Sequence, residues 1–264
     1  VHYLGFFTQK GNYGQGRGMP PTGYLEASAL EVEPDGSFEI IVSTEEKPGN
    51  WLPMERDTGT LIVRQTRLDR ENETIADRHV ERLGGDGMPT PFDPEACADG
   101  MTRAAGLVAG ASMLFASWAE GFKKHTTKLP RFDQNVSNMA GGVPDIAYYH
   151  SYWRIAPHQA LVIDLDPPEC AYWNFQLNNH WMESLDYRYH RIHINKHTAD
   201  YGPDGAVRIV VAHTDPGHPN WLDTCGHDFG TMCLRWAHAS HHPAPRTELV
   251  SLDTLRAGSP DGGV

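Results

Sequence analysis

Cysteine and long apolar runs are both scarce in this chain. Its 264 residues include four cysteines, and no two of them stand in a Cys-x-x-Cys spacing. So few cysteines exclude a small disulfide scaffold and predict reduced thiols, as in a cytoplasmic protein. No apolar run approaches the ~18 residues that a membrane-spanning helix needs. The chain begins at Val1 rather than Met, so we expect an N-terminal segment to be missing, and a removed leader stays open.

Positive charge is also in short supply. The chain has 22 Lys and Arg against 34 Asp and Glu, which gives a formal net charge of −12. This excess opposes binding to nucleic acid or to an anionic membrane surface, so neither is expected as a partner. The sequence lacks the zinc motif His-Glu-x-x-His and the Cys/His spacings of structural zinc sites, so no metal is expected. The cofactor stays unknown, with none expected. A small-molecule ligand is the expected partner, and a homo-oligomer stays open.

What the chain does contain is a long internal repeat. The segment Pro34–Val42 (PDGSFEIIV) is matched by Pro203–Val211 (PDGAVRIVV), 169 positions later. Two further blocks follow in the same order, with slips of one residue: an Asn-Trp-Leu block, and an apolar strand that contains Arg64 or Arg235. The shared order and spacing predict two copies of one structural unit.

Each copy is typical of β structure, and one helical pattern lies between them, from about Pro94 to Lys124. Asp93 precedes Pro94 as an N-cap would, and the small residues of the helix predict close packing on a sheet. The expected fold is mainly β with one inserted helical segment, built from two duplicated β-sandwich or jelly-roll-like units. The expected divisions are a first repeat that is incomplete at its N-terminus, a helical connector with a loop, a second repeat and a tail, at residues 1–83, 84–144, 145–252 and 253–264.

The repeat also separates fold-forming residues from candidate site residues. Residues shared by both copies are expected to build the fold, whereas polar residues found in one copy are better candidates for a site. The second copy and the segment just before it hold amide and aromatic side chains that suit a ring-bearing or hydroxylated ligand. The expected catalytic residues, acting as acid or base, are His150, His190 and His193. The expected ligand-binding residues are Tyr149, Tyr152, Asn174, Asn178, Trp181 and Arg235.

Arg235 differs from the other candidate residues, because Arg64 matches it in the first copy. A charge inside an apolar strand is costly unless it is paired. One interpretation pairs each arginine with the aspartate seven residues upstream, Asp57 or Asp228. The other interpretation makes Arg235 a clamp for the carboxylate of a ligand.

A family resemblance rests on four blocks of the second copy, which are Asp204-Gly205, Asp215-Pro216-Gly217, Pro219–Asp223 and Phe229-Gly230. Through them the second copy resembles the bacterial proteins that carry domain of unknown function 1214, and the first copy resembles them less completely. The resemblance covers residues 1–83 and 145–252, and its Asn-Trp-Leu block is the most specific part. It implies a β-sandwich of jelly-roll type and no particular activity. The histidines at 190, 193 and 197 are not part of the family's motif.

Three functions stay open. The first is an enzyme that acts on a small, largely apolar or ring-containing molecule by hydrolysis, elimination or isomerisation, in a pocket beside the second β unit. The second is a non-catalytic protein that binds a small molecule or carbohydrate, and the third is a structural assembly protein. If His150 and His190 met in one pocket, the enzyme would be favoured.

Overall fold

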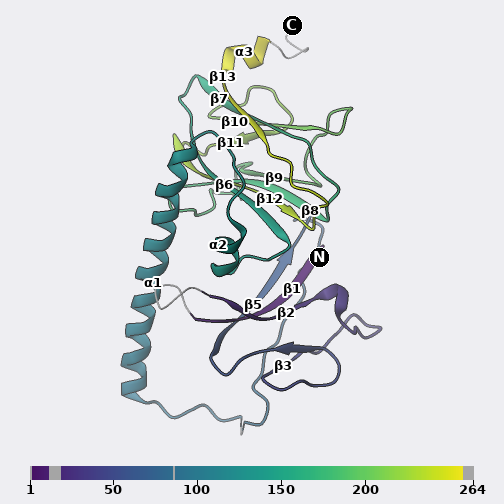
Figure 1. The fold of residues 1–264 in the computed structure, drawn as a ribbon, viewed down its shortest axis with the longest axis vertical. Coiled ribbons are helices and arrows are strands. Elements are labelled where there is room, and N and C mark those ends of the chain that lie inside the picture. The colour runs from purple at the N-terminus through teal and green to yellow at the C-terminus, as the bar shows by residue number, and fades with distance from the viewer. Residues whose placement is uncertain (1, 12–18, 86, 258–264) are drawn as a thin grey trace. The chain divides into compact units, whose positions relative to one another are not determined.

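The computed structural model of the chain describes residues 2–11, 19–85 and 87–257 (Figure 1). The chain divides into two compact units, one up to Ala111 and one from Ser112. Both units are mainly β, with one long helix inserted, so the expected fold class is confirmed. Within the described ranges, no helix is both long and apolar enough to cross a membrane. The four-part division stays a prediction, and residues 258–264 of its tail lie outside the described residues.

The first unit contains a three-stranded antiparallel sheet in the order β2-β1-β5. Its small core lies between this sheet and a short parallel pair, with Leu4, Phe6 and Leu52 buried at the centre. The strands are β1 (Tyr3–Lys10), β2 (Pro21–Glu26), β3 (Ile41–Ser43), β4 (Trp51–Pro53) and β5 (Thr58–Thr66), and the 3-10 helix η1 is Ala27–Ala29.

Helix α1 (Pro94–Phe122) matches the expected helical segment and is followed by the 3-10 turn η2 (Lys123–His125). The expected N-cap is present, because the Asp93 carboxylate accepts from the backbone N–H groups of Glu95 and Ala96. The expected buried face of small residues is wrong: only Ala119 and Phe122 are buried in the helix. Alanine and glycine permit close packing, but they supply little apolar area to drive it.

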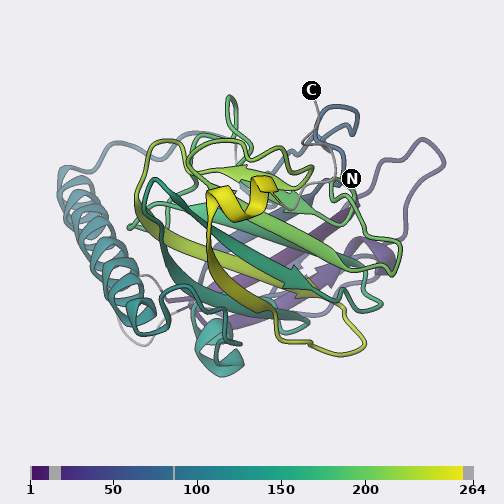
Figure 2. The ribbon, with the colours of Figure 1, turned by 90° about the horizontal axis from the view of Figure 1, so that it is seen from above.

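The second unit is a sandwich of two four-stranded sheets, in the orders β11-β10-β7-β13 and β6-β12-β8-β9. Its strands are β6 (Ile146–Arg154), β7 (Gln159–Leu165), β8 (Tyr172–Asn178), β9 (His193–Asn195), β10 (Val207–Ala212), β11 (Trp221–Asp223), β12 (Phe229–Ala237) and β13 (Arg246–Ser251). Two short helices, α2 (Gln134–Met139) and α3 (Leu252–Ala257), complete it. Figure 2 shows α3, in yellow, over the first of these sheets, where Leu252 packs on Ala160 and Val210.

Alternation along the strands sets which side chains fill this sandwich. The large buried cluster takes Trp173, Phe175 and Leu177 from β8 and Leu234 and Trp236 from β12, together with residues of β7 and β10. Side chains in a strand alternate between its two faces. The residues between these core positions therefore point to the opposite face of the sheet β6-β12-β8-β9.

The two units repeat the same pairings at matched positions. Arg64 lies opposite Gly5 in the pair β5–β1, and Arg235 lies opposite Asn174 in the pair β12–β8. The parallel pairs β3–β4 and β10–β11 correspond in the same way. The two halves are thus similar in register as well as in strand order.

The Asn-Trp-Leu blocks make the same hydrogen bonds in both units. Asn220 Nδ2 donates to the carbonyl oxygens of Asp200 (2.7 Å) and Arg208 (3.0 Å), and Asn50 Nδ2 makes the corresponding bonds at 2.8 and 3.0 Å. The indole of Trp221 packs beside the small cluster under α3 and donates to a β10 carbonyl. The blocks therefore build the fold in both halves.

Candidate functional site

The face of the sheet β6-β12-β8-β9 that points away from the sandwich core is polar along all four strands. We call it the outer face. Strand alternation and register bring its side chains into three cross-strand rows, in which directly opposite Cβ atoms are about 5 Å apart. The rows are Tyr152–Thr231–Asn178, then His150–Cys233–Gln176–His193, and then Tyr148–Arg235–Asn174–Asn195.

Six of the nine residues expected from the sequence share this outer face. They come from all four strands and are His150, Tyr152, Asn174, Asn178, His193 and Arg235. Their convergence follows from the cross-strand register, which no local motif specifies. The sheet thus collects residues that are spread over more than 80 positions of the chain.

Arg235 is the charged centre of the outer face. Its side chain is half-buried, and its guanidinium carbon lies 5.9 Å from the centroid of the Tyr148 ring. The expected pairing with Asp228 is wrong, because that carboxylate faces the His213 imidazole instead, at 3.9 Å. No carboxylate of the described residues lies within ion-pair distance of Arg235. The guanidinium is therefore available to an anionic ligand.

Asn174 is the direct neighbour of Arg235 across the strand pair. Its side-chain carbonyl oxygen is buried and has no hydrogen-bond partner in the part of the chain that the structure describes. Asn178, by contrast, accepts from Gln176 Nε2 at 2.7 Å. A buried acceptor without a partner costs free energy, so Asn174 is poised to accept a hydrogen bond from a ligand or a water molecule.

His150 lies in a column of aromatic rings. Its imidazole stacks between Phe122 and Tyr148, with centroid distances of 5.3 and 5.8 Å and interplanar angles of 6° on both sides. Burial first, and the charge of Arg235 second, lower the pKa of His150 to about 3. The imidazole is therefore neutral at physiological pH and can take part in hydrogen bonds without carrying charge.

A chain of polar contacts starts at Tyr152, at the other end of the outer face. Tyr152 Oη lies 3.0 Å from His180 Nδ1, and His180 Nε2 lies 3.6 Å from Glu120 Oε1. Lys123 Nζ donates to the same carboxylate at 2.6 Å. Burial raises the pKa of Tyr152, so its phenol is protonated and needs a base to act. An imidazole between a phenol and a carboxylate has the arrangement of a proton relay.

Sequence reasoning missed this relay. His180 is a polar residue of the second copy, but nothing in its local sequence marks a partner. Glu120 lies at the end of α1, and only the packing of that end beside β6 brings it near His180. Trp181 is 56% exposed and contacts the His180 ring edge-on rather than lining the outer face.

Tyr149 does not lie on the outer face. It follows Tyr148 in the strand, so it points to the opposite side, where it is 1% exposed in the sandwich core. Its hydroxyl donates to the carbonyl oxygen of His242 at 2.9 Å. The structure thus gives Tyr149 a place in the core rather than in a ligand site.

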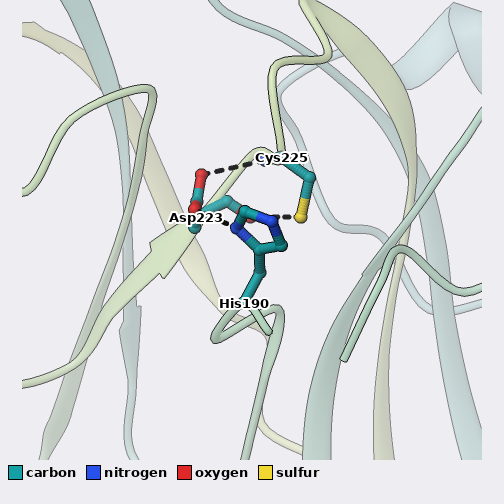
Figure 3. A group of neighbouring side chains, drawn as sticks. All are labelled: His190, Asp223 and Cys225. Atoms are coloured by element: carbon teal, nitrogen blue, oxygen red, sulfur yellow. Dashed lines mark hydrogen bonds and ion pairs between the residues drawn. The ribbon is translucent and has the colours of Figure 1, made fainter. Parts of the chain in front are cut away.

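His190 belongs to a second cluster, so it does not meet His150 in one pocket. His190 Nδ1 lies 2.6 Å from Asp223 Oδ2, and Cys225 is the third member (Figure 3). One donor atom from each residue lies within 4.8 Å of the others. Burial, and then the charge of Asp223, raise the pKa of the Cys225 thiol to about 11. Neither His193 nor His197 is part of this group of three.

A hollow of about 450 Å³ lies in the first unit. Glu31, Glu39 and Asn50 contribute to its walls. The Asn50 amide is already bonded to the backbone of both glutamates. These contacts hold a loop together, and they leave little hydrogen-bonding capacity for a ligand.

Comparison with solved structures supports the fold. A crystal structure of an uncharacterised protein from Burkholderia cenocepacia is 50% identical, covers 96% of this chain and 70% of its own, and superposes with a TM-score of 0.93. The VPA0106 protein from Vibrio parahaemolyticus is 11% identical, with 94% and 82% of the two chains covered and a TM-score of 0.47. No protein with a curated description matches the chain.

A family model described as "Protein of unknown function (DUF1214)" matches residues 21–67 and 155–240, which together make up just over half of the chain. The second match contains β8, β9 and β12 of the outer face and the whole His190 cluster. It leaves out β6, with His150 and Tyr152. The chain therefore belongs to the DUF1214 family of proteins of unknown function.

Proposed function

We propose that this protein is an enzyme that binds a small ring-bearing carboxylate on the outer face of its second unit and moves a proton on it. One observation carries the proposal. The half-buried Arg235 lies opposite Asn174 in the strand pair β12–β8. Among the described residues, no carboxylate pairs with this guanidinium, and the buried carbonyl oxygen of Asn174 has no hydrogen-bond partner. A donor of charge-assisted hydrogen bonds and an unused acceptor thus stand side by side.

The neighbours of Arg235 fit a ring. Tyr148 lies under the guanidinium, and Tyr172 projects from β8 onto the same face. Burial raises the pKa of Tyr172, and the positive charge of Arg235 opposes that rise, as it does at Cys233. A guanidinium in a half-buried setting attracts a carboxylate more strongly than one in water does, and the aromatic faces offer apolar area to the rest of the ligand.

The proton relay at Tyr152 supplies the chemistry. Tyr152 and Tyr148 are four residues apart in β6, about 13 Å along the strand, so the ligand must reach from the guanidinium beside Tyr148 to the Tyr152 phenol. When a ligand proton passes to Tyr152 Oη, the phenol proton passes to His180 Nδ1, and the imidazolium that forms faces Glu120. Returning the proton to a different atom of the ligand completes an isomerisation, with no atom gained or lost. Among hydrolysis, elimination and isomerisation, isomerisation fits best. The outer face does place a thiol beside a base, because Cys233 Sγ lies 4.0 Å from His150 Nε2, but Cys233 is buried and burial raises the pKa of its thiol, which disfavours the nucleophilic thiolate.

The residues at matched positions of the two units differ, and these differences support a ligand site in the second unit. Asn174 corresponds to Gly5, which offers no side chain, and Gln176 corresponds to Phe7. We infer that an internal duplication produced the two halves and that the second half then acquired the site. Cytoplasmic localisation stays a prediction, which the four unpaired thiols support.

Benzoate and benzyl alcohol are the probes for binding, because they differ in the carboxylate alone. Titration calorimetry is expected to show binding of benzoate and at least tenfold weaker binding of benzyl alcohol, since only the first pairs with Arg235. Arg235→Gln should remove this preference. Arg208→Gln is the matched control, because it deletes an exposed guanidinium of β10 that is paired with Asp164. Equal binding of both probes, or an equal effect of the control, would contradict the proposal.

Proton transfer is tested by exchange with solvent. Ring-bearing carboxylic acids with an acidic C–H bond are incubated in D2O with the protein, and proton NMR follows the loss of the C–H signal. Tyr152→Phe should lower the exchange rate at least about a hundredfold and leave benzoate binding intact, because it removes the acid–base group alone. Binding without exchange for every acid tested would instead establish the non-catalytic alternative, a small-molecule-binding protein.

A further inference from the structure

The His190 cluster brings three kinds of metal ligand together outside the proposed catalytic site. An imidazole, a carboxylate and a thiol each place one donor atom within 4.8 Å of the other two. The side chain of Asp223 comes from the end of β11, and those of His190 and Cys225 come from loops (Figure 3). All three are in contact with solvent: His190 is exposed, and Asp223 and Cys225 are half-buried.

The backbone holds the three donors in place. Asp223 ends β11, and its N–H donates to the carbonyl oxygen of Arg191 at 2.8 Å, which ties the loop that carries His190 to the sheet. Both segments are anchored in the core close to these ligands. Leu222, which precedes Asp223, and Ile192, two residues after His190, are at most 1% exposed. The donors are thus fixed by strand ends rather than by long mobile side chains.

A tight turn directs the thiol back toward Asp223. The Cys225 N–H donates to Asp223 Oδ1 at 2.9 Å, and the thiol lies 3.9 Å from the Asp223 carbonyl oxygen. Cys225 adopts a φ of +53°, a left-handed conformation that is uncommon for a residue with a side chain. Backbone strain of this kind is concentrated at functional sites.

The donor set and the local charge favour a divalent cation. Nitrogen, oxygen and sulfur ligands together suit zinc, and three protein ligands leave a fourth position for water. Asp223 contributes a negative charge to the group, and the nearby Arg188 is neutralised by Asp186 through two hydrogen bonds of 3.0 Å. The other nearby cation, Arg191, directs its guanidinium to the carbonyl oxygen of Pro219.

We propose that His190, Asp223 and Cys225 form a zinc-binding site. Two ligands of one tetrahedral zinc ion are about 3.3 Å apart, given zinc–ligand distances of about 2.0–2.3 Å. The 2.6 Å contact between His190 and Asp223 is therefore a hydrogen bond that opens when the metal binds. The thiol loses its proton to solvent as the zinc–sulfur bond forms, so one proton is released for each zinc ion bound.

Cobalt(II) is the probe that reports directly on the sulfur ligand. The full chain is treated with a chelator and then titrated with Co²⁺. One equivalent is expected to produce a thiolate-to-cobalt charge-transfer band in the near ultraviolet and visible bands of tetrahedral intensity. Cys225→Ser should abolish the charge-transfer band. Cys97→Ser, which removes an exposed thiol of α1, should leave it unchanged.

Zinc affinity then tests the other two ligands. His190→Gln and Asp223→Asn are each expected to weaken Zn²⁺ binding at least tenfold in calorimetry. His197→Gln, which removes an exposed histidine outside the group of three, should not. Circular dichroism of the metal-free variants verifies that they fold. A charge-transfer band that survives in Cys225→Ser, or the absence of any band in the wild type, would overturn the proposal.

A nucleophilic Cys–His–Asp arrangement is the competing interpretation of the same three residues. It predicts that iodoacetamide alkylates Cys225 faster than Cys97 in the metal-free protein and that His190→Gln abolishes the difference. The zinc site predicts that added Zn²⁺ protects Cys225 from alkylation, because the metal holds the sulfur. Rapid, His190-dependent alkylation that Zn²⁺ does not slow would overturn the zinc site. Benzoate binding is expected to be unchanged in all these variants, so the two proposals can fail separately.

Discussion

The two units share a strand pairing and differ in what that pairing displays. In the first unit, the guanidinium of Arg64 lies over the ring of Phe7, with 4.9 Å between its carbon and the ring centroid. In the second unit, the matched Arg235 lies opposite an asparagine and near Gln176 in the next row. A buried amide oxygen without a partner does not by itself distinguish the second unit, because the Gln9 carbonyl oxygen of the first unit also lacks a partner among the described residues. In the second unit, unlike in the first, the arginine lies directly opposite an asparagine whose carbonyl oxygen has no partner among the described residues.

This contrast shows how a repeated frame allows one half to specialise. The Asn-Trp-Leu blocks, the parallel strand pairs and the arginines recur because both halves need the same backbone arrangement. Outward-facing positions of a sheet carry no such requirement. They lie outside the sandwich core, so differences between the halves at these positions point to function.

The largest expected effect compares the two cores. Trp236→Ala removes a fully buried ring from the sandwich and is expected to cost about 3–5 kcal/mol of unfolding free energy. Its counterpart Gln65→Ala removes two hydrogen bonds to the backbone of Ala76 and should cost about 1 kcal/mol. Urea unfolding followed by circular dichroism measures both. Equal costs would contradict the placement of the main core in the second unit.

A second effect concerns acid sensitivity. Because burial and Arg235 lower the pKa of His150 to about 3, the unfolded chain binds a proton below about pH 6.5 that the folded chain does not bind. Stability is therefore unaffected by His150 above pH 6.5 and falls as the pH decreases from there toward 3. The loss is about 2 kcal/mol at pH 5.

His150→Phe should remove most of this pH dependence, and Arg235→Gln should reduce it partly, because burial is the larger cause. Urea midpoints at pH 7 and pH 5 give the comparison. Tryptophan fluorescence is a suitable signal, because the first unit contributes Trp51 alone. An unchanged pH dependence in His150→Phe would show that the imidazole is protonated in the folded protein.

The smallest expected effect is a difference in the unfolding free energy lost when the asparagine of each Asn-Trp-Leu block is replaced. Asn220 is 2% exposed and makes three hydrogen bonds to the backbone, whereas Asn50 makes the same bonds in a more exposed loop. Asn220→Ala is expected to cost about 2 kcal/mol and Asn50→Ala about 1 kcal/mol, because water can replace lost partners at the exposed site. Paired urea titrations test the difference. A larger cost for Asn50→Ala would contradict the comparison of burial.

Local patterns predicted the elements of the fold well. The Pro-Asp-Gly turns with their alternating segments located strands in both halves, and Asp93 with Pro94 marked the start of α1. Burial of that helix was predicted wrongly, because the composition of a face does not say whether another element covers it. Tyr149 was expected in the ligand site, but the phase of its strand, which the sequence alone left undetermined, turns it into the core.

The contacts that build the two candidate sites were harder to foresee. Arg235 was linked to Asp228 by spacing, yet strand pairing sends the two side chains to different neighbours. His190 meets Cys225 only because a backbone hydrogen bond from Asp223 joins two loops. Such long-range pairings depend on tertiary packing, and a single sequence carries no local signal for them.

The most direct test of the central claim is a benzoate titration of two matched variants, Arg235→Gln and Arg64→Gln. The outer face of the second unit is predicted to hold the carboxylate, so Arg235→Gln should weaken binding at least tenfold and Arg64→Gln by less than twofold. Melting temperatures verify that both variants remain folded. Equal weakening by the two variants, or weakening by Arg64→Gln alone, would contradict the assignment of the site to the second unit.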